Sequence, residues 1–244
     1  MTMPTWNSAA AAIAASVLLG LLAMPHARAA GPPSLSPAHD AAQADMLDVA
    51  AIAPGITLEM RYAGADNFTA HPVPGYEAPR CLLLRPAAEA LARVQAALQA
   101  QGHGLRLYDC YRPVRAVQAF VAWVHDPQEQ SRKALQYPDI DKRALIPDYI
   151  ADRSGHSRGA TVDLGLDDCR GGTCRPLDMG TDFDFFGPRA HTDATGLDVA
   201  QREHRQRLVA AMSAEGFVNY PMEWWHFTFQ PEPTPDTAYD FPVR

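Results

Sequence analysis

The sequence predicts a single α+β domain in which helices pack around an antiparallel sheet. Its composition is typical of a globular protein with one core, because 47% of the 244 residues are hydrophobic and 20% are charged. The 21 prolines and 16 glycines would interrupt long helices, which argues against a helical bundle or a coiled coil. The expected elements run in the order helix, strand, helix, long loop, strand, helix and strand pair. In a parallel α/β fold strands and helices would alternate regularly, and this order does not.

Residues 1–30 predict a secretory signal peptide. An uncharged, largely apolar run extends from Ser8 to Met24, and the segment ARA at 27–29 fits an A-x-A cleavage site. The α-amino group is the only positive charge before this run, and the run is close to the shortest length that spans a membrane. An uncleaved anchor is therefore the alternative. We expect cleavage, no stable membrane insertion of the mature protein, and a periplasmic or secreted location.

Residues 31–45 are rich in proline, serine and alanine and have no apolar period, so we expect a flexible lead-in. Residues 46–244 have a length that suits one domain. The chain carries 21 Lys and Arg against 28 Asp and Glu, which gives a net charge of −7. Such an acidic protein is not expected to bind the phosphate backbone of nucleic acid. The sequence does not indicate an oligomeric state.

The first half of the domain predicts two helices with a strand between them. A helix is expected over residues 86–100, because it opens with proline, is followed by glycine and has apolar residues at helical spacing. A short strand follows, in which Leu105 and Leu107 alternate with more polar residues. Pro113 then starts a second helix with one apolar stripe. Arg112 therefore lies at a junction between a strand and a helix.

The second half predicts a strand, a helix and a pair of strands. Apolar residues alternate over residues 161–166 and leave Asp163 on the opposite side from them. A helix over residues 198–215 ends at a glycine. Residues 217–220 and 224–229 then predict two strands joined through a proline.

Four cysteines remain after removal of the signal peptide. An even number in an exported chain favours disulfides. The simplest pairing joins Cys169 to Cys174 across a short turn, and Cys81 to Cys110 over a longer loop. A zinc site of four thiolates is the alternative, but the spacing lacks the paired C-x-x-C motifs of such sites.

Two short clusters contain the residue types of a catalytic zinc site. Such a site needs three nitrogen or carboxylate ligands and a nearby carboxylate that does not bind the metal. His156, Asp163 and His226 supply candidate ligands, and Glu223 is the candidate base. The alternative is that the histidine before the strand is a surface or hydrogen-bonded side chain and that Asp163 is a turn or cap residue.

Several longer motifs follow one another along the domain: RYAGADNFTAHPVPGYE (61–77), Tyr111-Arg112-Pro113, SGHSRGATVDL (154–164), MGTDFDFF (179–186), EGFVNYPMEWWHF (215–227) and DFPV (240–243). In this order they resemble the motifs of the D-alanyl-D-alanine dipeptidases of the VanX type. These belong to the wider zinc D-Ala-D-Ala metallopeptidases, which share a fold with the hedgehog signalling domain. The resemblance covers nearly all of residues 46–244 and implies that they form the catalytic domain.

The resemblance implies one zinc ion per chain with His156, Asp163 and His226 as ligands. Water activated by the zinc would attack the peptide carbonyl, with Glu223 as general base. Arg112 would stabilise the developing oxyanion with its fixed positive charge. The implied reaction is hydrolysis of D-Ala-D-Ala to two D-alanines.

The resemblance also implies residues that bind the free dipeptide. Asp184 would hold the ammonium group, Tyr62 and Tyr76 would line the pocket, and Ser154 would lie near the other polar groups of the substrate. A turn or cap role is the alternative for Asp184.

The sequence departs from the resistance enzymes in three respects. Thr161 stands where the wider superfamily usually has alanine, Cys110 occupies a position that is often glycine, and the expected signal peptide is absent from cytoplasmic resistance enzymes. An exported enzyme would meet its dipeptide outside the cytoplasm, in wall turnover or scavenging. Two other functions remain open: a carboxypeptidase or endopeptidase of the same superfamily, and a zinc-binding module without catalysis.

Overall fold

The computed structural model describes residues 1–2 and 33–244, and residues 33–244 fold as one compact unit. The predicted signal peptide lies almost entirely outside the described residues. Among the residues that are described, no helix is both long enough and apolar enough to cross a membrane.

The elements confirm the α+β class. The helices are α1 (Val49–Ile52), α2 (Arg85–Gln99), α3 (Val114–His125), α4 (Lys133–Gln136) and α5 (Val199–Ala214), with 3-10 helices η1 (Arg61–Ala63), η2 (Lys142–Leu145), η3 (Gly155–Arg158) and η4 (Pro188–Ala190). The strands are β1 (Ser34–Leu35), β2 (Met46–Asp48), β3 (Thr57–Leu58), β4 (Leu82–Leu84), β5 (His103–Asp109), β6 (Thr161–Asp168), β7 (Arg175–Pro176), β8 (Phe217–Asn219), β9 (His226–Phe229) and β10 (Thr237–Ala238).

The main sheet has the strand order β3-β5-β6-β9-β8, and β7 also pairs with β6. All of its pairs are antiparallel except β3 with β5, which is parallel at the edge. The expectation of an antiparallel sheet therefore holds for its centre and fails at one edge. Two smaller sheets join β2 to β4 and β1 to β10.

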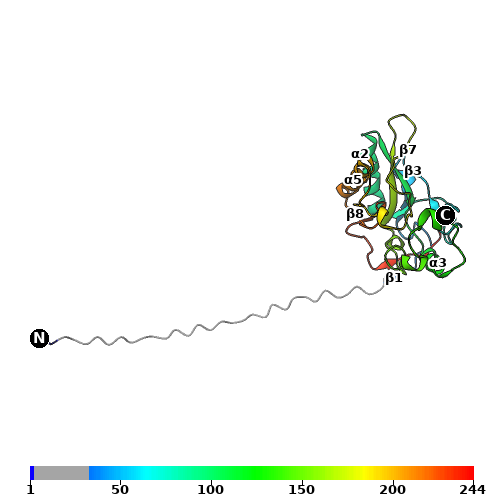
Figure 1. Cartoon of the computed structure of the whole chain (residues 1–244), viewed down its shortest axis with the longest axis horizontal. Helices are drawn as coiled ribbons and strands as arrows, with labels where there is room; N and C mark the ends of the chain where they lie inside the picture. Colours follow the sequence, from blue (N-terminus) through cyan, green and yellow to red (C-terminus); the bar gives the residue numbers. More distant parts are fainter. Residues whose placement is uncertain (3–32) are drawn as a thin grey trace. The chain divides into compact units, whose positions relative to one another are not determined.

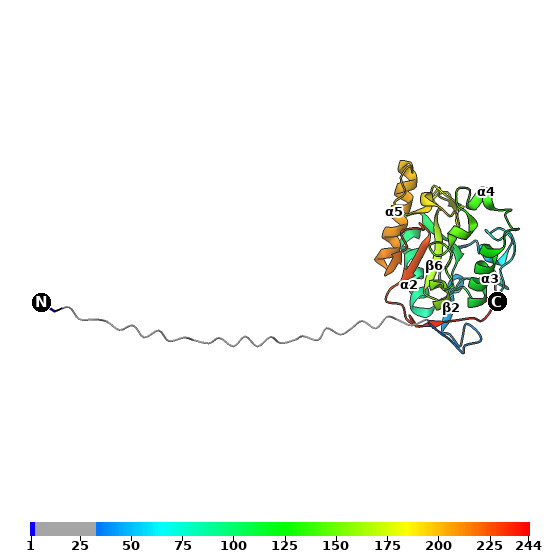
Figure 2. The same cartoon turned by 60° about the horizontal axis from the view of Figure 1, so that its bottom comes forward.

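The three long helices form where the apolar spacing predicts them. Pro86 lies in the first turn of α2, and α5 begins with a capping box in which Asp198 and Gln201 bond each other's backbone. Helices α2 and α5 lie side by side in both views, whereas α3 lies on the other side of β6 (Figures 1 and 2). The central strand β6 is buried over most of its length, so polar residues on it are shielded from water.

The expected flexible lead-in differs from the structure over its described part. Ser34 and Ser36 donate backbone hydrogen bonds to the carbonyls of Asp236 and Ala238, both at 2.8 Å, and form the β1–β10 pair. These backbone hydrogen bonds to a segment about 200 residues away give the lead-in a defined structure. The expectation of flexibility rested on local sequence alone, which contains no information about such long-range bonds.

The last predicted strand begins later than expected. Trp224 and Trp225 lie in a turn, and β9 starts at His226. The turn is closed by two backbone bonds, from Glu223 to the carbonyl of Tyr220 (3.0 Å) and from Tyr220 to the carbonyl of His226 (2.9 Å). Both tryptophans are nevertheless buried, because their side chains fill the core beneath this turn.

Both expected cysteine pairs are disulfides in the structure, Cys81 with Cys110 and Cys169 with Cys174. No free cysteine remains among the described residues, so the alternative of a four-thiolate zinc site is wrong.

Candidate metal centre

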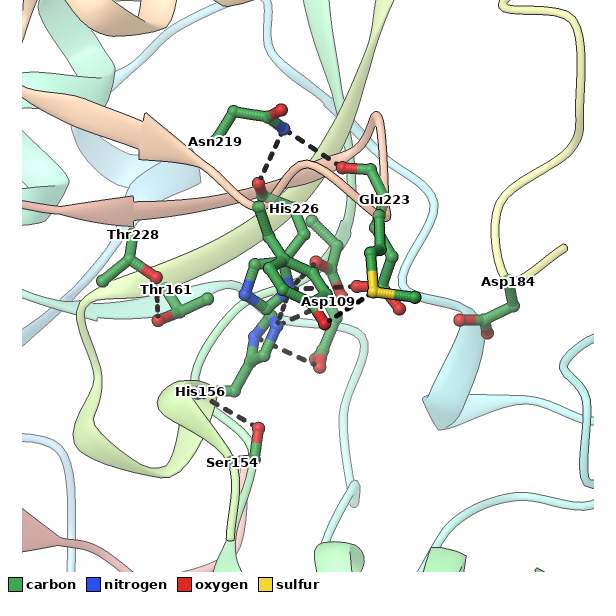
Figure 3. A network of polar contacts seen from close by, with 12 residues as sticks. Asp109, Ser154, His156, Thr161, Asp184, Asn219, Glu223, His226 and Thr228 are labelled. Carbon is green, nitrogen blue, oxygen red and sulfur yellow. Dashed lines mark hydrogen bonds and ion pairs between the residues drawn. The ribbon is translucent and has the colours of Figure 1, made fainter. Parts of the chain in front are cut away.

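Three elements far apart in sequence bring the expected metal ligands together. His156 lies in η3, Asp163 in β6 and His226 at the start of β9. Asp163 and His226 are directly opposite each other in the β6–β9 ladder, which places their side chains on the same face of the sheet. One ligand atom from each of the three residues lies within 4.8 Å of the others. The two imidazole rings point toward one another in Figure 3.

Hydrogen bonding sets the tautomer of His156. Its Nδ1 lies 2.8 Å from the backbone carbonyl oxygen of Cys110, which is only an acceptor, so Nδ1 carries the proton and donates. Its Nε2 faces the cluster and lies 3.2 Å from an oxygen of Asp163 and 3.3 Å from Nδ1 of His226. A neutral imidazole whose other nitrogen donates to a carbonyl is the form that binds metals.

The charges of this cluster fit a divalent cation. Burial raises the pKa of Asp163, but the neighbouring His156 and then His226 lower it by more. The pKa therefore lies below its usual value, and this side chain stays a carboxylate. Burial lowers the pKa of His226 and favours its neutral ring. One buried oxygen of Asp163, Oδ1, lacks a hydrogen bond of good geometry, although it lies 3.1 Å from Nδ1 of His226. Two imidazoles and one carboxylate form the ligand set of catalytic zinc sites, so these residues fit the expected ion.

Glu223 lies beside this cluster in the turn before β9. One of its carboxylate oxygens is 3.5 Å from Nδ1 of His226, and its side chain is buried. Burial, reinforced by the negative charges of Asp163 and Asp184, raises the pKa of Glu223 well above its usual value. A carboxylate in this environment has an increased affinity for a proton, as a general base requires.

Asn219 holds the turn that carries Glu223. Its side-chain amide donates to the backbone carbonyls of Glu223 (3.1 Å) and His226 (3.0 Å), as Figure 3 shows. The sequence reasoning missed this residue, because an asparagine at a strand end has no distinctive pattern.

Arg112 points into the site from the β5–α3 junction. Its Nε donates to Asp109 at 2.9 Å, and its Nη2 donates to Asp163 at 3.4 Å. The guanidinium also lies over the rings of Tyr62 and Phe120, at 5.3 and 5.0 Å from their centroids. Burial opposes its charge, but Asp109 and other neighbours raise its pKa well above the usual value, so the guanidinium remains a fixed cation.

Asp109 is the second residue that the sequence reasoning missed. It is fully buried at the end of β5 and accepts hydrogen bonds from Arg112 and from the hydroxyl of Tyr76 (2.6 Å), while also lying 3.6 Å from Nδ1 of His156. The available signal was its position at the end of a buried strand, two residues before the Tyr-Arg-Pro motif.

A cavity of about 300 Å³ contains the cluster. The candidate ligands, Glu223, Arg112 and Asp184 supply its polar wall. The segment 147–154 forms much of the remaining wall and includes Arg153, and aromatic side chains supply the apolar part, namely Tyr62, Phe68, Phe120, Tyr149, Phe186, Tyr220 and Trp225.

The four expected substrate-binding residues have different positions. Asp184 lines the cavity and accepts hydrogen bonds from the hydroxyl of Tyr62 at 3.0 and 3.1 Å. Burial, then the charge of Asp163, raises the pKa of Asp184 well above its usual value. Ser154 also lines the cavity, and its hydroxyl accepts a bond from the backbone of His156 (3.2 Å) as the cap of η3. Tyr76 is not among the lining residues, because its hydroxyl is directed to Asp109.

Comparison with known proteins assigns the chain to a family. The sequence profile of the D-ala-D-ala dipeptidases matches residues 42–244. The D-alanyl-D-alanine dipeptidase of Streptomyces coelicolor is 43% identical over 78% of this chain and 93% of its own length. The dipeptidase of Enterococcus faecium is 40% identical over 78% of this chain and 94% of its own length.

A dipeptidase from Escherichia coli is 36% identical over 75% of this chain and 83% of its own length. Among solved structures, the Zn(II) complex of the vancomycin-resistance D,D-pentapeptidase VanY aligns over 61% of this chain and 73% of its own, with 17% identity and a TM-score of 0.37. This structural similarity is too low to support an assignment. The family profile and the sequence relatives, in contrast, match most of the chain. The chain belongs to the D-Ala-D-Ala dipeptidase family of peptidases.

Proposed function

We propose that the protein is a zinc-dependent dipeptidase that hydrolyses D-Ala-D-Ala to two D-alanines. The observation that carries this proposal is the meeting of His156, Asp163 and His226 within 4.8 Å in a cavity that also contains Glu223 and Arg112. The D-alanyl-D-alanine dipeptidases that are 36 to 43% identical to the chain support the choice of substrate. These three ligands would hold one zinc ion per chain.

Glu223 would move the proton that hydrolysis requires. A zinc ion held by the three ligands would polarise the peptide carbonyl and acidify the attacking water. The carboxylate of Glu223 accepts a proton from that water as the new carbon–oxygen bond forms, and its raised pKa suits this task. It then gives the proton to the amine when the carbon–nitrogen bond breaks, so the group returns to its starting state.

Arg112 would stabilise the negative charge that develops on the carbonyl oxygen. Its guanidinium is already oriented by Asp109 and by two aromatic rings, so little reorganisation is needed during the reaction. Because Asp109 binds Nε and Asp163 accepts from Nη2, Nη1 would be the nitrogen that faces the substrate.

The two ends of a free dipeptide would be recognised by opposite charges. Asp184, with Tyr62 as its hydrogen-bond donor, offers a buried carboxylate to the ammonium group. At the wall formed by segment 147–154, Arg153 offers a cation to the carboxylate, and Ser154 offers a hydroxyl. The pKa of Asp184 is raised when no substrate is bound. The positive charge of a bound ammonium group would lower that pKa and favour the ionised carboxylate.

We also propose that the protein acts outside the cytoplasm, where it would process dipeptide from wall turnover or for scavenging. The signal-like segment at residues 1–30 and the two disulfides support this location. Fractionation of producing cells, with mass measurement of the mature N-terminus, tests it. Uncleaved protein in the cytoplasm would contradict the proposal.

The decisive experiment measures D-alanine release by the purified mature protein, with and without a chelator. The substrates are free D-Ala-D-Ala and a pentapeptide that ends in D-Ala-D-Ala. Chelator-sensitive cleavage of the dipeptide alone is the expected result. Cleavage of the pentapeptide would indicate a carboxypeptidase, and inactivity toward both substrates would indicate a binding module.

A further inference from the structure

The Cys81–Cys110 disulfide includes a residue whose backbone carbonyl contacts the candidate ligand His156. Cys110 follows the last residue of β5 and Cys81 precedes the first residue of β4, so the bond joins the end of one strand to the start of another. The two residues are 29 positions apart in sequence, and both are fully buried. This bond therefore crosslinks the ends of two buried strands.

Hydrogen bonds connect the segment after β5 to His156 at two points. The carbonyl oxygen of Cys110 accepts from Nδ1 of His156 at 2.8 Å, and the backbone N–H of Arg112 donates to the carbonyl of His156 at 3.3 Å. Between them, the N–H of Tyr111 donates to the carbonyl of the residue after Cys81, at 2.9 Å. The disulfide and these three bonds form one connected unit.

Regular sheet pairing does not by itself locate the Cys110 carbonyl. The β5–β6 ladder has a register shift between Leu107 and Asp109, and β5 ends at Asp109. The backbone at the next residue therefore depends on contacts other than the ladder. The disulfide is the covalent contact at that residue, and it holds the segment against β4.

We propose that the Cys81–Cys110 disulfide is a positioning element for the metal ligand His156. By holding the Cys110 carbonyl at Nδ1, it keeps the imidazole in the tautomer and orientation that direct Nε2 to the ion. It thereby increases the affinity of the three-residue site for its metal. This inference rests on the proposed metal site, but it concerns metal binding and can be tested without any substrate.

The second disulfide provides a matched control. Cys169 and Cys174 close a turn of the chain after β6, five positions apart, and both are only half-buried. The described hydrogen bonds of the site do not include either residue. Its removal also deletes one crosslink but should leave the ligands in place.

The test compares metal binding by three proteins: the wild type, the pair Cys81→Ala and Cys110→Ala, and the pair Cys169→Ala and Cys174→Ala. Zinc affinity is measured by competition with a chromophoric chelator, and the visible spectrum of bound Co²⁺ reports the ligand geometry. We expect the first pair to bind zinc about 10-fold more weakly, as is typical when a partner of a metal-binding histidine is disturbed. Its Co²⁺ spectrum should change as well, whereas the second pair should match the wild type in both measurements.

Loss of a disulfide can also destabilise a protein globally, so the thermal midpoint of each metal-free protein is measured alongside. If the Ala pair does not fold, Cys81→Val with Cys110→Ala replaces buried volume without the covalent link. Unchanged zinc affinity and Co²⁺ spectrum in the folded Cys81 and Cys110 variant would overturn the proposal. So would an equal loss in the Cys169 and Cys174 pair, because that loss would be a general effect of removing a crosslink. Failure of all three proteins to bind zinc would instead refute the proposed function.

Discussion

Replacement of Glu223 by glutamine separates proton transfer from metal binding. The change keeps the size of the side chain and one oxygen but removes its ability to accept a proton. In the structure a Glu223 oxygen lies 3.5 Å from Nδ1 of His226, and the residue is not part of the three-residue ligand cluster. We therefore expect Glu223→Gln to retain zinc and to lose turnover.

The size of the loss follows from the environment of the carboxylate. Burial and two neighbouring acids raise the pKa of Glu223 well above its usual value, which increases its affinity for a proton. A positioned general base of this kind contributes about 10²- to 10⁴-fold to the rate. This corresponds to about 3 to 5.5 kcal/mol of activation free energy at about 1.4 kcal/mol per tenfold change. We expect kcat to fall by that factor and KM to change little.

The assay combines zinc content per chain with D-alanine release from D-Ala-D-Ala. His156→Ala is the paired variant, because it removes a ligand and should lose both metal and activity. Circular dichroism verifies that both variants fold. A Glu223→Gln protein that retains more than about a tenth of wild-type kcat would refute Glu223 as the base, since the expected loss is at least about 10²-fold. Loss of zinc from that variant would refute the separation of base and ligands.

Three further predictions concern other residues. Asp184→Asn should raise KM for D-Ala-D-Ala about 10- to 100-fold, because a charge-assisted hydrogen bond to the ammonium is lost; an unchanged KM would exclude that contact. Arg153→Gln should raise KM for the dipeptide about 2- to 5-fold, as for an exposed ion pair, without affecting an analogue whose carboxylate is an amide; equal effects on both would contradict carboxylate binding. Hydrogen bonds from Gln201 and from the backbone of Gly180 lower the pKa of Asp178, so its folded-state pKa lies below its unfolded value. The stabilisation that comes from this lowered pKa is present above the unfolded pKa and is lost as the pH falls through the folded pKa. Because Asp178 is exposed and water screens its interactions, Asp178→Ala should cost only about 0.5 kcal/mol at neutral pH and less in acid; a pH-independent difference in urea unfolding would refute this.

The structure also explains why the site tolerates so many buried charges. Arg112 lies between the carboxylates of Asp109 and Asp163, and the hydroxyls of Tyr76 and Tyr62 donate to Asp109 and Asp184. Asp109, Asp163 and Asp184 therefore each have a hydrogen-bond donor, which reduces the cost of keeping these acids away from water. Removal of one member leaves another unpaired, so substitutions here should affect folding as well as chemistry.

Local sequence signals were sufficient for the helices. The apolar spacing within residues 86–100, the proline at the start and the glycine after the end describe contacts between neighbours in the chain, and α2 forms where they predict it. The candidate ligands could also be chosen from the sequence. The two histidines and the aspartate lie within motifs that resemble those of the family, and the resemblance assigns them the role of metal ligands. The structure brings His156, Asp163 and His226 together, as the motifs implied.

The sequence by itself determined the fold class, the long helices and the family to which the chain belongs, and it favoured the cysteine pairing that the structure then established. Only the tertiary structure decided that β3 runs parallel to β5, that the lead-in pairs with β10, and that Tyr76 bonds Asp109 instead of lining the cavity. The physical reason is distance along the chain. Helix signals lie within a few residues of each other, whereas strand pairing and buried hydrogen bonds join residues that become neighbours only when the whole domain has packed.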